Sequence, residues 1–174
     1  NIVFGHDLEL PKAENTTRFF SLNVNGIRRG KDYQDVLEMA QAFKTSSIDL
    51  AGLSETNIDW RSAAHSKFYE KFQRVFHHTR LSTSSSTIKY KSIYQPSGTA
   101  KLGTDKYAGR ITGTGGDTEI GRWSYIKMLG KLGRTIILVT VYNVCHKEND
   151  QAGSRTAHTQ QVSLLLRQRR PVFG

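Results

Sequence analysis

Ser21-Leu22-Asn23-Val24-Asn25-Gly26 and Leu53-Ser54-Glu55-Thr56 are the stretches that decide the fold, because each ends an apolar run with polar residues. The first run, residues 18–24, is aromatic and apolar and stops at an Asn-Gly turn signal. Such a run predicts a strand followed by a turn. Residues 48–53 predict a second strand in the same way.

A helix is predicted after each of these strands. Asp32 is expected to cap the first, over residues 33–45, and the second is expected to begin at about Ser62. The apolar residues that recur at helical spacing on one face of these helices are Val36, Leu37, Ala40 and Phe43 in the first, and Ala64, Phe68, Phe72, Val75 and Phe76 in the second. The first half therefore reads strand, helix, strand, helix.

The second half has a different pattern. Residues 82–87 (STSSST) predict a polar, mobile loop. Four short runs separated by glycine follow and predict an antiparallel meander, with breaks such as the one at Gly103. These runs are residues 92–102, 109–114, 122–129 and 134–142. Ser154 can cap a last helix over residues 154–169, which Pro171 ends.

The composition is that of one globular domain, divided here into an irregular arm over residues 1–16 and a domain over residues 17–170. The formal net charge is +10 and the pI is about 9.9. Such a charge favours polyanions, of which nucleic acid is the obvious one, although a basic surface also serves solubility or acidic subunits. No apolar run is long enough to span a bilayer, and the opening residues lack the pattern of a secretion signal. A single cysteine, Cys145, makes a reducing intracellular compartment the default.

The two strand ends indicate where chemistry could occur. If the strands are neighbours in one sheet, Asn23 and Glu55 project side by side at one rim. A carboxylate beside an amide suits a hard divalent cation, which prefers oxygen ligands. The alternative is that Glu55 only caps the next helix and that the Asn-Gly pair is only a turn.

Five stretches in the same order resemble the endonuclease/exonuclease/phosphatase superfamily, in particular the endonucleases of non-LTR retrotransposons. The first two resemble the strand ending in Asn and the strand whose Glu binds the metal, and the others resemble the paired strands and the helix that follow. They are SLNVNGI, LAGLSETN, SGTAKLGTDKYAGRI, GRWSYIKMLGKLGRTIILVTVYNVC and SRTAHTQQVSLLLRQ, which together run from Thr17 to Gln168.

The resemblance implies a role for three residues. Glu55 would be the carboxylate ligand of a Mg²⁺ or Mn²⁺ ion, and Asn23 would help hold the metal or the scissile phosphate. Tyr142 would donate a hydrogen bond to that phosphate. Asn25 stands where many relatives carry Asp, which removes a negative charge near the metal.

The resemblance also implies a fold, an α+β four-layer α/β/β/α sandwich with largely antiparallel sheets, of which this chain supplies the N-terminal half, roughly one sheet and its helices. Two family motifs are absent from the sequence, the Asp-x-Asn after a later strand and the closing Asp-His pair. Half a sandwich would expose an apolar sheet face, so we expect a protein partner to cover it, or the sequence to be a fragment.

Several residues could contact nucleic acid, either through phosphates or by stacking on a base. Those we favour are Arg28, Arg29, Lys31, Arg110 and Trp123. The leading hypothesis is a divalent-metal phosphodiesterase acting on nucleic acid, incomplete and weak or inactive as given, and nuclear if it is a retroelement endonuclease. Two alternatives stay open: a non-catalytic structural or nucleic-acid-binding subunit derived from such an endonuclease, and a phosphatase of inositol lipids or small molecules.

Overall fold

The computed structural model describes residues 10–28, 30–87 and 97–142, and only the main chain of residue 31. Among the described residues, three helical turns of three or four residues accompany the longer elements. In chain order the elements are β1 (Phe19–Asn23), η1 (Lys31–Tyr33), α1 (Gln34–Thr45), β2 (Leu50–Ser54), α2 (Ala64–Gln73), β3 (Thr79–Ser84), β4 (Thr99–Thr104), α3 (Asp105–Ala108), β5 (Ile111–Gly116), β6 (Trp123–Leu129), η2 (Lys131–Gly133) and β7 (Thr135–Val141).

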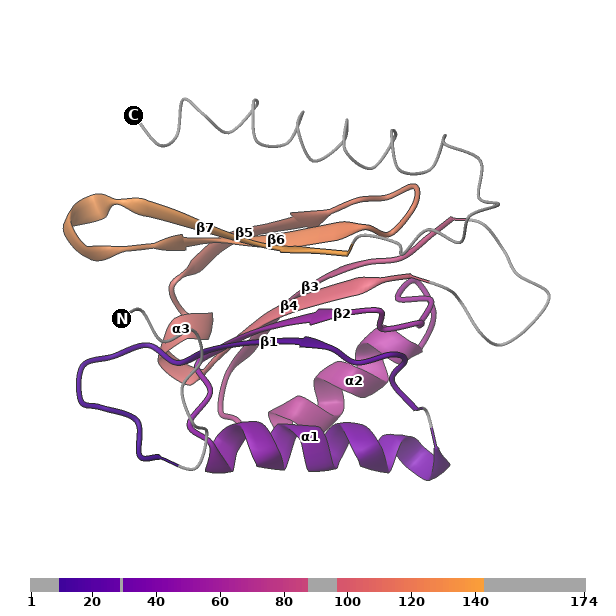
Figure 1. Ribbon diagram of the computed structural model, residues 1–174, viewed down its shortest axis with the longest axis horizontal. Helices are drawn as coiled ribbons and strands as arrows, with labels where there is room; N and C mark the ends of the chain where they lie inside the picture. Colours follow the sequence, from indigo (N-terminus) through magenta and orange to yellow (C-terminus); the bar gives the residue numbers. More distant parts are fainter. Residues whose placement is uncertain (1–9, 29, 88–96, 143–174) are drawn as a thin grey trace, which may run out of the picture.

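Two sheets pack face to face, with α1 and α2 on the outer face of the first (Figure 1). The first sheet has the strand order β1-β2-β4-β3, in which only β1 and β2 are parallel. The second is the antiparallel sheet β5-β6-β7. The predicted α+β class, with largely antiparallel sheets in layers, is therefore confirmed.

The predicted apolar faces of the two helices form the core between the helices and the first sheet. Val36, Ala40 and Phe43 of α1 are buried, as are Phe68 and Phe72 of α2. Phe72 stacks on Phe68 with 4.7 Å between ring centroids and meets the Phe43 ring edge-on at 5.8 Å. Burial of these aromatic rings is what fixes the helices on the sheet.

Asp32 does not cap the first helix, which corrects the sequence-based expectation. Tyr33 stands at the N-cap, and both Asp32 and Tyr33 have a left-handed backbone with φ near 56° and 55°. The carboxylate of Asp32 instead lies 2.6 Å from the Nζ of Lys71, a buried lysine of α2. This ion pair holds the pKa of the Asp32 carboxyl below its usual value.

The serine-rich stretch is not a mobile loop, because β3 extends through Ser84 and the following serines are buried. Ser82 Oγ donates to the carbonyl of Gly115, and Ser84 Oγ shares a hydrogen bond of 2.8 Å with Thr99 Oγ1. These hydroxyls face the second sheet, where hydrogen bonds offset the cost of their burial. A polar composition therefore concealed a strand at the edge of the first sheet, with hydroxyls buried under the second.

The meander is confirmed for its last three strands, whereas β4 pairs with β2 and β3. The break expected at Gly103 is wrong, since Gly103 lies inside β4 opposite Leu50. A Cβ on Gly103 would come within 2.8 Å of Ile111 Cδ1 of the second sheet. Glycine at this position is a packing requirement rather than a turn signal.

The expectation of one sheet with an exposed inner face is also wrong, because β5, β6 and β7 pack over β2, β3 and β4. The chain supplies the facing layer itself. The predicted helix over residues 154–169 lies outside the described residues. Within the described part of the chain, no helix is long and apolar enough to cross a membrane.

Gly52 lets the two sheets approach at the centre of β2. A Cβ at this position would collide with Thr140 Oγ1 of β7 and would lie 3.1 Å from Lys101 Nζ. We expect Gly52→Ala to lower the free energy of unfolding by about 1–3 kcal/mol, the usual cost of overpacking. Urea denaturation measures this effect, with Gly133→Ala as a control near an empty space. A loss at Gly52 no larger than the strain cost at Gly133 would contradict the packing argument.

Candidate active site

The C-terminal ends of β1 and β2 lie side by side, as predicted. The strands are parallel and Asn23 stands opposite Ser54. The chain continues this pairing beyond the strands, since the N–H of Val24 donates to Ser54 O at 3.0 Å and the N–H of Gly26 donates to Glu55 O at 2.6 Å. The two loops that carry the candidate residues are therefore joined by their main chains.

Both loops are held in conformations that few residues adopt. Asn23 Oδ1 accepts a hydrogen bond of 3.0 Å from the N–H of Asn25, which closes a local turn. Asn25 and Gly26 have φ values of 45° and 96°, and Glu55 has a φ of 52°. Few glutamates have a left-handed backbone. Residues with such strained backbones cluster at functional sites.

Glu55 has a carboxylate without a partner in the described part of the chain. Its side chain is half-buried, and its carboxylate makes no hydrogen bond or ion pair with any residue that the structure describes. Asn23 is exposed, and its amide oxygen has one of its two lone pairs engaged by Asn25. Oxygen atoms with unused lone pairs suit Mg²⁺ or Mn²⁺, which binds through one or two carboxylates and keeps several waters.

The same end of the sandwich carries Tyr142. Thr140 lies over Gly52, and Leu138 packs against the core cluster that contains Leu50, which fits β7 running in the same direction as β2. Tyr142 therefore follows β7 at the end where Glu55 follows β2. Its N–H donates to Arg122 O at 2.7 Å, and the Arg122 guanidinium lies over its ring at 5.0 Å.

The predicted nucleic-acid contacts divide between the two ends. Arg28 is exposed just beyond the Asn23 turn, and Trp123 begins β6 beside the segment that pairs with Tyr142. Arg110 lies at the other end, after β4 and α3, where its Nε donates to Leu129 O at 3.0 Å. Arg29 and the side chain of Lys31 lie outside the described residues. Arg28 therefore borders the Asn23 turn, Trp123 lies on the outer face of β6 with its ring against Tyr125, and Arg110 lies at the opposite end.

Sequence reasoning missed two polar features between the candidate loops and the sheets. Asn57 is buried, and its Nδ2 has no hydrogen-bond partner among the described residues. Thr99 Oγ1 donates to Ser124 Oγ of the second sheet at 2.7 Å, in line with the Ser84 hydroxyl. The only signal in the sequence was a cluster of small polar residues, which is typical of loops as well.

Among the described residues there is no group of three or more histidine, cysteine, aspartate or glutamate side chains that could hold a metal ion together. The donors at this rim are one carboxylate and one amide oxygen. This set fits a Mg²⁺ or Mn²⁺ ion that keeps most of its waters and shares its shell with a phosphate. It does not fit a structural zinc site, which takes four nitrogen or sulfur ligands.

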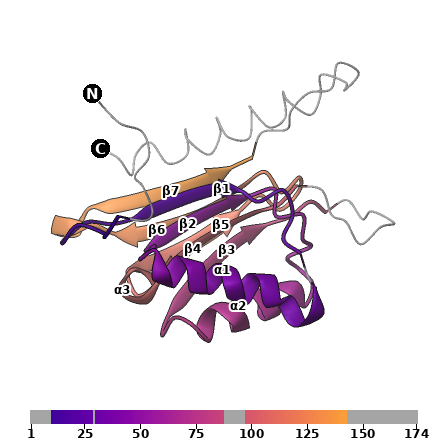
Figure 2. The same ribbon diagram turned by 60° about the horizontal axis from the view of Figure 1, so that its bottom comes forward.

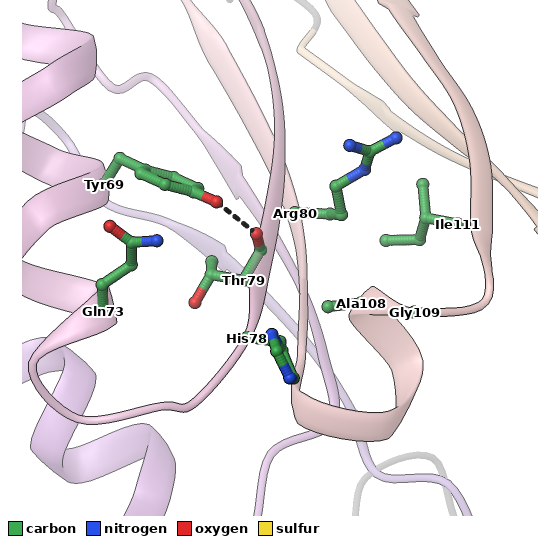
Figure 3. Close-up of a pocket in the computed structure, with 8 residues that line it drawn as sticks. All are labelled: Tyr69, Gln73, His78, Thr79, Arg80, Ala108, Gly109 and Ile111. Carbon is green, nitrogen blue, oxygen red and sulfur yellow. Dashed lines mark hydrogen bonds between the residues drawn. The ribbon is translucent and has the colours of Figure 1, made fainter.

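A hollow of about 360 Å³ lies at the other end of the molecule, where β3 begins and β4 ends. Figure 3 shows the residues that line it. It lies between α2, the start of β3 and the end of α3, where Tyr69 Oη donates to Thr79 O at 2.9 Å. Its lining residues are Tyr69, Gln73, His78, Thr79, Arg80, Ala108, Gly109 and Ile111. None of these lining residues is a carboxylate, whereas the end that carries Asn23 also carries Glu55.

No protein-family model and no curated protein matches the chain. Solved structures match its fold: an endonuclease/exonuclease/phosphatase family protein from Leptotrichia buccalis (TM-score 0.53, 14% identity, 84% of this chain and 63% of that one), the human Nocturnin catalytic domain with a bound sulfate anion (0.56, 13%, 91% and 59%), and truncated Caenorhabditis elegans TDP2 (0.50, 14%, 87% and 55%). This chain thus spans 55–63% of the length of these three structures.

Proposed function

We propose that this chain, which has the endonuclease/exonuclease/phosphatase fold, is part of a divalent-metal-dependent phosphodiesterase that acts on nucleic acid. The observation that carries the proposal is the meeting of three strand ends at one rim, which brings together the segments of Asn23, Glu55 and Tyr142. The net charge of +10 supports a polyanionic substrate. A reducing intracellular compartment, nuclear for a retroelement endonuclease, belongs to the same proposal.

The proposal gives a role to each of five residues. Glu55 and Asn23 would hold Mg²⁺ or Mn²⁺, and Tyr142 would donate its hydroxyl proton to a phosphate oxygen. The bound ion would supply Lewis-acid stabilisation of the charge that develops on the phosphoryl group. Arg28 would attract the phosphate backbone, and Trp123 would offer an aromatic surface to a base.

A second candidate is a non-catalytic structural or nucleic-acid-binding subunit. The observation that favours it is the absence from the sequence of the Asp-x-Asn and Asp-His motifs that complete the family's site. Groups that position and activate water act together, so losing them removes most of the rate enhancement. On this argument the chain as given is weak or inactive by itself.

The test measures metal binding and cleavage separately. We expect Glu55→Gln to weaken Mn²⁺ binding about tenfold or more in a calorimetric titration, because it removes the only charged ligand of the proposed site. Glu14→Gln, at an exposed glutamate of the N-terminal region, is the matched control and leaves binding unchanged. Nicking of supercoiled plasmid with Mg²⁺ is measured on the same three proteins.

The two readouts separate the candidates. Mn²⁺ binding and nicking that both depend on Glu55 support the phosphodiesterase. Binding that depends on Glu55 without nicking supports a metal site that needs completion. Equal Mn²⁺ binding by all three proteins contradicts the site, and equal nicking, or none, then leaves only the non-catalytic subunit.

A further inference from the structure

The hollow whose lining residues Figure 3 shows lies at the end of the molecule where β1 and β2 begin. Figure 2 shows α3 at this end, opposite to the end where the two strands lead to Asn23 and Glu55. The hollow crosses the start of β3, an edge strand of the first sheet, with α2 on one side and Ile111 of β5 on the other. It is therefore separate from the candidate active site.

Three polar side chains that line this hollow make no hydrogen bond or ion pair with any residue that the structure describes. They are Gln73 at the end of α2, His78 just before β3, and Arg80 within β3. Figure 3 shows Gln73 on one side of β3, Arg80 on the other, and His78 lower in the view than both. Their hydrogen-bonding groups are thus available to one molecule that lies across the strand.

The start of β3 adds a main-chain donor to these side chains. Arg80 pairs with Gly103 of β4, and Tyr69 Oη donates to Thr79 O at 2.9 Å, so the N–H and the C=O of Thr79 both point away from β4. Thr79 is buried, yet neither its N–H nor its Oγ1 has a partner among the described residues. Buried polar groups normally have partners, so this residue indicates an acceptor that enters the hollow.

The charges around the hollow favour an anion, because no carboxylate lines it and the carboxylates beside it are occupied. Asp105, which follows β4, has its Oδ2 3.0 Å from Lys44 Nζ. Glu70 of α2 has its Oε1 2.6 Å from Arg74 Nη2. The Arg80 guanidinium therefore has no counter-ion in the described part of the chain.

A phosphate group fits these donors better than a carboxylate does. The donors come from different sides, and a phosphate offers three terminal oxygens in a tetrahedral arrangement, whereas a carboxylate offers two in one plane. The guanidinium of Arg80 is a planar fork that binds phosphate through two hydrogen bonds.

The size of the hollow calls for a ligand larger than a phosphate ion. Its volume of about 360 Å³ corresponds to roughly twelve water molecules at about 30 Å³ each, so a phosphate alone would leave most of it empty. The rest of the ligand would lie near Gln73, whose amide both donates hydrogen bonds to hydroxyl groups and accepts them. A body that carries several hydroxyls, such as a sugar, matches this amide.

We propose that this hollow binds a sugar phosphate, with the phosphate on Arg80, His78 and the N–H of Thr79 and the sugar hydroxyls on Gln73. The site is independent of the proposed phosphodiesterase activity, because it lies at the opposite end and needs no metal ion. A free sugar phosphate and a nucleotide present the same chemistry to these residues. The experiment has one arm for each of them.

The experiment titrates the isotopically labelled whole chain with ribose 5-phosphate in the presence of EDTA and follows its N–H signals by NMR. We expect the largest shifts at N–H groups that line the hollow, among them those of Thr79 and Gly109. Arg80→Gln should weaken binding about tenfold or more, because it removes a charged hydrogen-bond donor. Arg74→Gln is the matched control, since its guanidinium is already paired, and should change the affinity by less than about twofold.

Gln73→Ala tests the sugar end of the site. It should weaken binding of ribose 5-phosphate several-fold and leave that of inorganic phosphate unchanged, because Gln73 contacts only the hydroxyls. Adenosine monophosphate forms the second arm. If it binds more tightly than ribose 5-phosphate, and still depends on Arg80, a nucleotide is the ligand; if it binds more weakly, a free sugar phosphate is. Gln73, Arg74 and Arg80 are all exposed, and the NMR spectrum of each variant reports its folding directly.

Four results would overturn the proposal. They are no binding of ribose 5-phosphate, binding that ignores Arg80, equal losses in Arg80→Gln and Arg74→Gln, and largest shifts in the loops of Asn23 and Glu55. The third would mean attraction by general positive charge, and the fourth would place the anion at the candidate active site. Mn²⁺ binding and plasmid nicking should be unchanged in Arg80→Gln, so failure of this proposal and failure of the phosphodiesterase are distinguishable.

Discussion

Lys101→Met is expected to stabilise the protein by several kcal/mol at pH 6 and to have little effect near pH 10. Lys101 is buried beneath the second sheet, and burial lowers the pKa of its amine from 10.5 to about 7. Each tenfold change in proton affinity corresponds to about 1.4 kcal/mol, so the charged form costs the folded state roughly 4–5 kcal/mol. Methionine has a similar length and no charge to bury.

The pH dependence follows from the direction of this change. The folded pKa lies below the unfolded one, so between pH 7 and 10.5 the unfolded chain binds more protons. Wild-type stability should therefore rise with pH across this window. Below pH 7 the Lys101 amine is protonated in both the folded and the unfolded state, and the full cost of burying its charge is present. Above about pH 10.5 the amine is neutral in both states and this cost has disappeared.

Urea denaturation of wild type and Lys101→Met at several pH values measures the difference in their free energies of unfolding. Taking this difference cancels the contributions of other titrating groups, which both proteins share. Lys71→Met is the matched control, because Lys71 is equally buried but has Asp32 at 2.6 Å. Removing Lys71 deletes an ion pair and should bring no pH-dependent gain. A difference between wild type and Lys101→Met that stays constant from pH 6 to 10 would show that the amine is compensated in the folded state.

Phe72→Ala is expected to cost about 3–5 kcal/mol, a large part of the 5–15 kcal/mol that stabilises a typical domain. Phe72 is fully buried and its ring contacts those of Phe43, Phe68 and Phe76. Truncation leaves a cavity between both helices and the sheet. The loss should appear as a lower urea midpoint.

Gln73→Ala, the exposed neighbour on the same helix, is the matched control for that change and should alter stability by less than about 0.5 kcal/mol. Equal losses at the two positions would mean that helix propensity, rather than ring packing, holds α2 in place. An unchanged urea midpoint for Phe72→Ala would contradict the position of the core itself.

The sequence predicted the secondary structure best where the pattern of apolar residues matches the face that the element buries. The apolar faces of α1 and α2 follow from helical spacing, and the strands β1 and β2 follow from short apolar runs that end in polar residues. The predicted neighbourhood of the Asn23 and Glu55 segments followed from the parallel pairing of two such strands. Their metal-binding roles, and that of Tyr142, remain predictions.

The sequence predicted other features wrongly where local composition conflicts with tertiary structure. Ser82 and Ser84 read as loop residues, since nothing in the sequence shows that the main chain of Gly115 and the hydroxyl of Thr99 are their hydrogen-bond partners. Asp32 read as a cap, because its partner Lys71 is far along the chain. Such pairings depend on which strands become neighbours, and local sequence signals carry no information about that.

The position of β4 between β2 and β3 sets an order of events during synthesis. β3 pairs only with β4 among the described strands, so it leaves the ribosome without a hydrogen-bonding neighbour. Residues 99–104 must emerge before the first sheet can close. Until then the nascent chain displays a serine-rich strand and an open β2 edge, and a ribosome that pauses in this interval would hold an intermediate prone to association.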